Sequence, residues 1–468
     1  MKEASRRNFL KTVSLGASFA GLQSIVGTAS ADSKALTKDA SKMVTATGYG
    51  PLKEGDSRLR LPEGFSYVTM SKKGELMDDG FHVPGAHDGM AAFAGPDGST
   101  VLIRNHEVKD GDIHNGPFKG KNELTGKLEA SDFYDTAHGK HNCVGGTTTL
   151  VYDTREQKLL KHFLSLTGTV RNCSGGPTPW GSWITCEEVL LSKGSKFEHD
   201  HGYNFEVPAN SEIGLATPVA LKEMGRFNHE AVAVDPASGI VYQTEDRPDG
   251  LIYRYIPNVR GQLSKGGKLQ ALAIKDPAFK DTRNWSGSSF PTQKELEVEW
   301  IDMDNVESPK DDLRDRGSKA GAAVFARGEG MIYGNGEVYF ACTNGGPKKF
   351  GQIFRYKPSR YEGQEREKTS PGVLELFIES YDHELMKSCD NLTIAPWGDV
   401  VICEDDGRDS AIVGITQEGK IYHIAHVAVA SELAGCCFSP DGTTLFVNIQ
   451  WYPGETLAIT GPWLDRKD

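Results

Sequence analysis

The chain has 468 residues and a formal net charge of −12 at pH 7, so it is long enough for a large hydrophobic core, and nucleic acid is not an expected partner. Its eight cysteines all follow residue 142 and none forms a C-x-x-C pair, which excludes zinc-ribbon and dithiol redox motifs.

The first 31 residues have the features of an export signal. Residues 5–11 read SRRNFLK, the twin-arginine signature, and a weakly apolar stretch follows that ends on Ala29-Ser30-Ala31, a small-residue cleavage site. We predict a signal peptide over residues 1–31 and passage of the folded protein through the twin-arginine translocase, to the periplasm or the medium. After Ala31 no apolar run of about 18 residues occurs, so no membrane span is expected in the mature protein. The alternative is a short basic amphipathic tail.

From about residue 95 a unit recurs that consists of a turn ending in glycine, a short strand, and polar or acidic residues at the strand end. We count six copies, which begin at Gly98, Gly181, Gly239, Gly336, Gly398 and Gly442. Further strands follow at short distances, so each unit resembles part of an antiparallel meander. The spacing is too irregular for a solenoid but fits blades with loop insertions. The sequence therefore predicts an all-β protein, a six-bladed β-propeller with loop insertions, in one domain over residues 32–468 whose first part, 32–60, is irregular.

Equivalent strand ends of a propeller meet around one channel, and here they are acidic. The strand ends after the glycines carry Glu107, Cys186-Glu187-Glu188, Glu245-Asp246, Asn344, Glu404-Asp405 and Gln450, and the preceding strands begin with His87-Asp88, His229-Glu230, Arg327-Gly328-Glu329, Asp390-Asn391 and Glu432. Such a ring of carboxylates would repel itself unless cations neutralised it. We therefore expect a metal centre. The alternative is that these acids are exposed loop residues.

The residue types limit the chemistry of such a centre. Carboxylate and amide oxygens favour Ca²⁺, and one thiolate among them indicates a transition metal. Cys186 lies in the acidic strand end, although a buried small hydrophobe is the alternative, and strand alternation separates it from Glu187. Arg327 would share a face with Glu329 in an extended strand, where a guanidinium beside metals suits a phosphate monoester. An ordinary salt bridge is its alternative. His138, His141 and Cys143 have ligand-like spacing but are interpreted as a surface cluster.

Several strings together resemble one family. They are PTPWGSWITCEE (177–188), GRFNHEAVAVDP (225–236), YQTEDR (242–247), ARGEG (326–330), CDNLTIAPWGDVVICEDD (389–406) and FSPDGTTLFVNIQ (438–450). These are similar to the PhoX family of secreted alkaline phosphatases, from about residue 45 to the end. The resemblance implies a six-bladed propeller, twin-arginine export, and an iron (Fe³⁺) and calcium (Ca²⁺) centre that hydrolyses phosphomonoesters.

The resemblance also implies roles for individual residues. Cys186 would bind iron, Glu230 and Glu329 would bridge metals, and Arg327 would contact the phosphate. The remaining implied residues, which complete the calcium side or are placed less securely, are Asp390, Asn391, Glu404, Asp405, Glu187, Glu245 and Asp246. We count Arg327 and Asn391 as active-site residues and the others as metal ligands.

We therefore expect an exported monomer that acts on small phosphate esters. A calcium-dependent lactonase or related esterase, with His229 or His87 as base, is a second hypothesis. A non-catalytic, metal-stabilised propeller that binds a ligand in its channel is a third.

Overall fold

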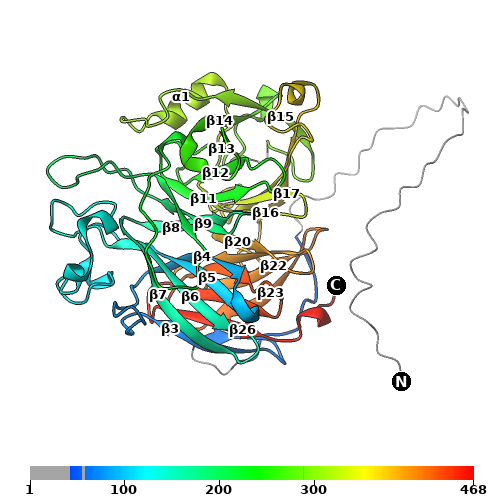
Figure 1. Ribbon diagram of the computed structural model, residues 1–468. Helices are drawn as coiled ribbons and strands as arrows, with labels where there is room; N and C mark the ends of the chain where they lie inside the picture. Colours follow the sequence, from blue (N-terminus) through cyan, green and yellow to red (C-terminus); the bar gives the residue numbers. More distant parts are fainter. Residues whose placement is uncertain (1–42, 55–57, 288) are drawn as a thin grey trace, which may run out of the picture. The chain divides into compact units, whose positions relative to one another are not determined.

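The six predicted repeats fold into six successive antiparallel meanders, called blades 1 to 6 here in chain order (Figure 1). The computed structural model describes residues 43–54, 58–287 and 289–468, so the predicted signal peptide lies outside the described residues. All six predicted turn glycines connect the first and second strands of a blade, with φ between 71° and 99°. Because that region suits glycine, it explains why the turns could be recognised in the sequence.

The first three blades contain the chain from His87 to Asp302. Blade 1 has β4 (His87–Ala94), β5 (Thr100–His106), β6 (Gly145–Asp153) and β7 (Lys158–Thr169). Blade 2 has only β8 (Asn172–Pro177), β9 (Ser182–Glu187) and β10 (Asn204–Pro208). Blade 3 has β11 (His229–Val234), β12 (Val241–Glu245), β13 (Ile252–Pro257) and β14 (Gly267–Ile274), extended by β15 (Leu296–Asp302).

The other three blades follow the helix α1 (Leu313–Ala320). Blade 4 has β16 (Gly328–Gly334), β17 (Glu337–Cys342), β18 (Gln352–Lys357) and β19 (Val373–Glu379). Blade 5 has β20 (Cys389–Ile394), β21 (Val400–Glu404), β22 (Ala411–Ile415) and β23 (Lys420–Val427). Blade 6 has β24 (Leu433–Phe438), β25 (Thr444–Ile449), β26 (Glu455–Thr460) and, from near the N-terminus, β3 (Ser66–Lys72).

The first strand of each blade lies at the centre. The inner strands β4, β8, β11, β16, β20 and β24 each contact the next in this order, and β24 contacts β4, so they close a ring (Figure 1). The predicted propeller is therefore confirmed. Its hydrogen-bonded sheets, however, number five rather than six in the described part of the chain, because β15 pairs with β19 and joins blades 3 and 4 into one nine-stranded sheet.

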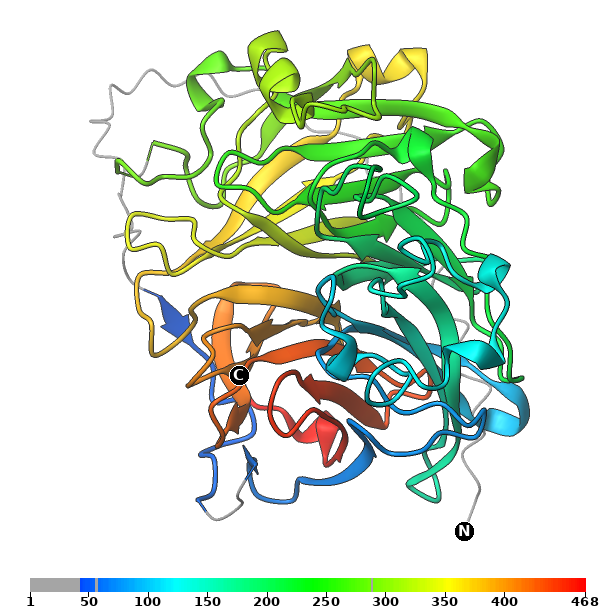
Figure 2. The same cartoon turned by 90° about the vertical axis from the view of Figure 1, so that its left-hand side faces the viewer.

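Segments from the two ends of the chain complete two blades. β3 pairs antiparallel with β26, and Figure 2 shows the blue N-terminal strands beside the orange and red C-terminal ones. Two short strands, β1 (Val44–Thr45) and β2 (Leu59–Arg60), pair with β23 of blade 5. Such pairing of distant segments closes the ring and leaves fewer unpaired strand edges.

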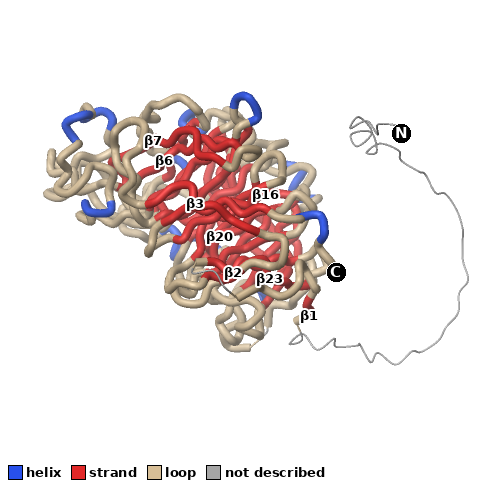
Figure 3. The backbone as a smooth tube through the Cα atoms, turned by 90° about the horizontal axis from the view of Figure 1, so that it is seen from below, coloured by secondary structure: helices blue, strands red, loops and turns tan. Residues whose placement is uncertain are grey.

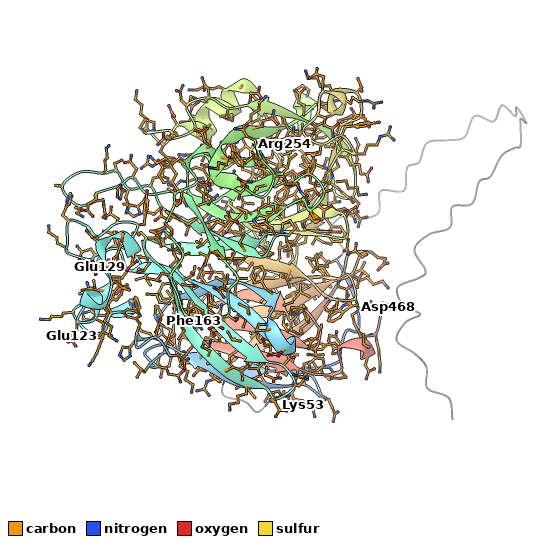
Figure 4. All side chains as sticks on the ribbon, in the orientation of Figure 1. Lys53, Glu123, Glu129, Phe163, Arg254 and Asp468 are labelled. Atoms are coloured by element: carbon orange, nitrogen blue, oxygen red, sulfur yellow. The ribbon has the colours of Figure 1, made fainter. Side chains whose placement is uncertain are left out.

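Loops and short helices surround the strands (Figure 3). Aliphatic and aromatic side chains fill the space between neighbouring blades. Ion pairs also connect the blades. Nη1 of Arg254 in β13, labelled in Figure 4, lies 2.6 Å from Oε1 of Glu362, in the loop between β18 and β19. All eight cysteines are buried free thiols. Among the described residues, no helix combines the length and the apolar character needed to cross a membrane.

Candidate metal centre

Every inner strand carries a β-bulge near its beginning. In each blade the register between the inner and second strands shifts there by one extra residue on the inner strand, as between His87 and Met90 of β4 and between His229 and Val232 of β11. A bulge turns its first side chain away from the regular alternation. The first bulged residues are Asp88, Cys173, Glu230, Glu329, Asp390 and, in blade 6, Gly435. All of them except Gly435 line one cavity of about 120 Å³.

Gly435 differs for a steric reason. Its φ is 64°, and a Cβ atom at this position would lie 2.4 Å from the carbonyl oxygen of Asp88. Only glycine therefore fits at this bulge, and blade 6 contributes Glu432 and Gln450 to the cavity instead.

The residues that directly follow the second strands form the second half of the cavity wall. Glu107, Glu188, Asp246 and Asp405 occupy this position in blades 1, 2, 3 and 5. Their backbone N–H groups donate, over 2.9–3.1 Å, to the carbonyl of the residue that precedes the inner strand of the same blade. Thr343 of blade 4 makes the same bond to Arg327, at 3.1 Å. This repeated bond brings both sets of side chains to one end of the channel.

The cavity concentrates negative charge. Nine carboxyl groups and two guanidinium groups line it, so full ionisation would leave a large negative excess. Burial, and the repulsion between neighbouring carboxylates, raise the pKa of Asp88, Glu230, Glu329 and Asp390 well above the usual range. Burial raises the pKa of Glu188 to about 8 although Arg171 opposes it. Bound cations would relieve this repulsion, so the wall has the chemistry of a metal site.

Two overlapping sets of side chains could each hold a metal ion. Cys173, Glu188 and Glu230 form one set, and Glu230, Glu329 and Asp390 form the other, with ligand atoms within 4.8 Å of one another in each. The thiol of Cys173 donates to Oε2 of Glu230 at 2.6 Å. Because Glu230 belongs to both sets, its two carboxylate oxygens could bridge two ions.

The two arginines of the cavity are each paired with two carboxylates. Arg327 donates from Nε and Nη2 to Asp246, at 2.8 and 2.7 Å, and its Nη2 lies 2.9 Å from Oε1 of Glu329. Arg171 pairs with Glu107 at 2.6 Å and also with Glu188. Arg327 directly precedes β16 and has a φ of 54°. Its backbone is therefore in the left-handed region, whereas the sequence predicted an extended strand at this residue.

Cys186 does not reach this cavity. It lies on β9 in the apolar core between blades, fully buried, where burial raises the pKa of its thiol. Its side chain packs among apolar residues of blades 2 and 3, and the thiol at the cavity belongs to Cys173. The Asn172-Cys173 pair occupies the same place in β8 as the His229-Glu230 pair in β11. This equivalent position in the repeat identifies Cys173 as a cavity residue, although it is not an acid.

The predicted ligands Glu187, Glu245 and Glu404, each the last residue of its strand, also lie outside the cavity wall. Their carboxylates bind groups outside the cavity instead. Glu187 accepts from Gly202 at 2.8 Å and Glu404 from Lys387 at 2.9 Å, whereas Glu245 accepts from the Tyr253 hydroxyl at 3.0 Å. These three acids anchor loops behind the site.

Asn391 lies one residue beyond Asp390 and lines a separate cavity, of about 130 Å³, further along the channel. Its Nδ2 donates to Oδ1 of Asp390 at 3.2 Å, and its Oδ1 accepts from the backbone N–H of Gly435. In this structure Asn391 therefore positions a cavity residue. The other predicted residues, Glu230, Asp246, Glu329, Asp390, Asp405 and Arg327, all line the acidic cavity.

A third group with possible ligand atoms, Asp135, Cys143 and His201, is buried away from the channel. His201 lies between two carboxylates, 2.7 Å from Glu187 and 3.4 Å from Asp135, and these raise its pKa to about 12 although burial opposes them. The positive charge of His201 therefore already offsets the negative charge of the carboxylates beside it. Of the predicted histidine cluster, His138 bonds the Gly194 carbonyl at an exposed site.

Comparisons with known proteins give one family. The sequence profile of alkaline phosphatase PhoX matches residues 47–454. Among solved structures, Pseudomonas fluorescens PhoX in complex with vanadate, a transition state analogue, is similar over 90% of this chain and 98% of its own, with 16% identity and a TM-score of 0.65. A gluconolactonase of Xanthomonas campestris covers 88% of this chain and 98% of its own, with 11% identity and a TM-score of 0.36. No curated protein matches the sequence.

Proposed function

Because the chain belongs to the alkaline phosphatase PhoX family, we propose that it hydrolyses phosphate monoesters at the acidic cavity in its channel. The family membership confirms the resemblance noted in the sequence. The location of the site is inferred from the cavity of about 120 Å³, which residues from all six blades line. These residues supply nine carboxyl groups, one thiol and two guanidinium groups.

The donor set fits the metals that the resemblance implies. Thiol and carboxylate together, as at Cys173 and Glu230, suit iron, and the carboxylates of Asp88, Asp390 and Asp405 suit calcium. Such cations supply positive charge that stabilises a phosphoryl group during its transfer. We propose Cys173, not Cys186, as the thiolate ligand, and Glu230 as the carboxylate shared between two ions.

Arg327 fits the role of a phosphate-binding residue. Nε and Nη2 of its guanidinium are held by Asp246 and Glu329, which fixes the plane of the group before substrate arrives. Its third nitrogen, Nη1, remains available to a phosphoryl oxygen. A rigid, charged donor of this kind contributes most where negative charge increases in the transition state.

The lactonase hypothesis has less support. His87 and His229, the two candidate bases, are fully buried and bonded through Nε2 to the carbonyls of Pro84 and Gly225. Burial lowers the pKa of both imidazoles, and neither side chain lines the acidic cavity.

We also propose export in the folded state by the twin-arginine route, to the periplasm or the medium. The support is the SRRNFLK string with the small-residue site at Ala29-Ser30-Ala31. This route suits a protein whose cavity residues come from six blades and meet only after folding.

The test is phosphate release from p-nitrophenyl phosphate by natively exported protein, together with its iron and calcium content. Glu230→Gln should lower iron affinity by more than about 100-fold, since changes one shell further from a metal already cost about 10-fold to 100-fold. Glu245→Gln is the matched control, because Glu245 is equally buried but outside the cavity, and it should keep its metals. No phosphate release by metal-loaded wild type, with turnover of lactones, would contradict the proposal.

A further inference from the structure

The residue before each inner strand occupies an equivalent place in all six blades. Its carbonyl accepts from the backbone N–H of the residue after the second strand, at 2.9–3.3 Å throughout. The six residues are Ala86, Arg171, Asn228, Arg327, Ser388 and Glu432. Side chains rich in N–H donors therefore occupy three successive blades, 2, 3 and 4. The corresponding residues of the other three blades are small or acidic.

Arg171 and Arg327 repeat one arrangement within this arc. In each, Nε and Nη2 are bonded to carboxylates that line the cavity. Their side chains are exposed to similar degrees, 30% and 37%. Within the part of the chain that the structure describes, Nη1 of neither arginine has a hydrogen-bond partner, and neither atom belongs to the buried groups left without one. Each arginine of the cavity wall thus has one donor nitrogen that no protein group occupies.

Between the two arginines lies β11, which carries Glu230. Asn228, directly before β11, donates from Nδ2 to Glu188 at 3.0 Å and so links the acids of blade 2 to blade 3. A monoester dianion that approaches an acidic cavity is repelled unless cationic groups face it. The arc formed by blades 2 to 4 is the part of the wall where both guanidinium groups are found.

We propose that Arg171 is a second phosphate-binding residue, which acts together with Arg327 to seat the phosphoryl group of the substrate on the blade 2 to blade 4 side of the cavity. This inference rests on the proposed phosphatase function. The competing role is purely structural: Arg171 would only neutralise Glu107 and Glu188, and its loss would then affect metals or folding rather than phosphate.

The test is orthophosphate binding to the metal-loaded, natively exported protein, measured by calorimetry without any turnover. Arg171→Lys keeps the charge but loses the fork, so it should weaken orthophosphate binding and raise the KM for p-nitrophenyl phosphate by about 10-fold to 100-fold, the range for a hydrogen bond to a charged group. Iron and calcium content and the thermal midpoint should stay at wild-type values. Arg314→Lys is the matched control, since Arg314 pairs with Asp311 at 2.7 Å outside the cavity, and should change none of these.

The outcomes separate the two roles and the two proposals. Orthophosphate affinity within about 2-fold of wild type in Arg171→Lys, or loss of metals in both Arg171→Lys and Arg171→Gln, would overturn the phosphate-binding role. If wild type binds orthophosphate but hydrolyses no monoester, the phosphatase proposal fails, and Arg171 is still judged by the affinity of its variants for orthophosphate.

Discussion

Replacement of Cys173 by serine tests which thiol belongs to the metal centre. Sγ of Cys173 lies 2.6 Å from Glu230, inside a set of three possible ligands. Burial and the nearby carboxylates raise the pKa of this thiol, so without a cation it keeps its proton. A bound transition metal favours the thiolate. Serine cannot supply an equivalent soft anionic ligand.

The expected size of the effect follows from the place of Cys173 among the proposed metal ligands. Changes one shell further out lower metal affinity by about 10-fold to 100-fold, so Cys173→Ser should lower iron affinity by at least about 100-fold, which is about 2.7 kcal/mol. The assay is iron per protein after dialysis against a graded series of chelator concentrations, with p-nitrophenyl phosphate hydrolysis in parallel.

Cys186→Ser is the matched control. Cys186 is fully buried among apolar side chains, so a hydroxyl there should cost about 1–3 kcal/mol of stability and leave iron affinity unchanged. If Cys186→Ser instead loses iron while Cys173→Ser retains it, the placement of the thiol is wrong.

Three further outcomes are expected. His201→Gln should destabilise the protein by about 3–5 kcal/mol, because it leaves Glu187 and Asp135 without the cation between them. Folding raises the pKa of His201 to about 12, from about 6.5. The difference in free energy of unfolding between wild type and His201→Gln should therefore be complete below about pH 6.5 and decline as pH rises towards 12. Urea unfolding from pH 5 to 9 measures this difference, and a difference that grows with pH would refute the reasoning. Chelation should abolish hydrolysis, and calcium alone should not restore it; full recovery with calcium would argue against the transition metal. Lysine at both Arg6 and Arg7 should keep the precursor inside the cell, as fractionation would show, whereas normal export would rule out the twin-arginine route.

Much of the fold could be predicted from local chemistry. The six turn glycines, Gly98 to Gly442, all need positive φ, and strand-forming residues follow each of them, so the repeat was visible despite its irregular spacing. The fusion of blades 3 and 4 was not, because β15 and β19 lie 71 residues apart, from the end of one to the start of the other, and pair through only a few residues. Nothing local in either strand specifies this partner.

Of the predicted site residues, six line the acidic cavity and five lie outside it, and this difference has a physical cause. Strand alternation correctly indicated that Cys186 and Glu187 face opposite ways, but the inner strands bulge, which alternation does not anticipate. The bulge turns Cys173 into the cavity. On the second strands, the residue past the strand end lines the cavity, so Glu188 lines it rather than the predicted Glu187, and of the predicted pair Glu245 and Asp246 only Asp246 does.

The most direct test of the metal centre is a crystal structure of natively exported protein with diffraction data collected on both sides of the iron absorption edge. The anomalous difference map should place iron within coordination distance of Cys173 and Glu230, between β8 and β11, with phosphate or vanadate beside Arg327. Iron found beside Cys186 or between Cys143 and His201, with no cation at Glu230, would contradict the account.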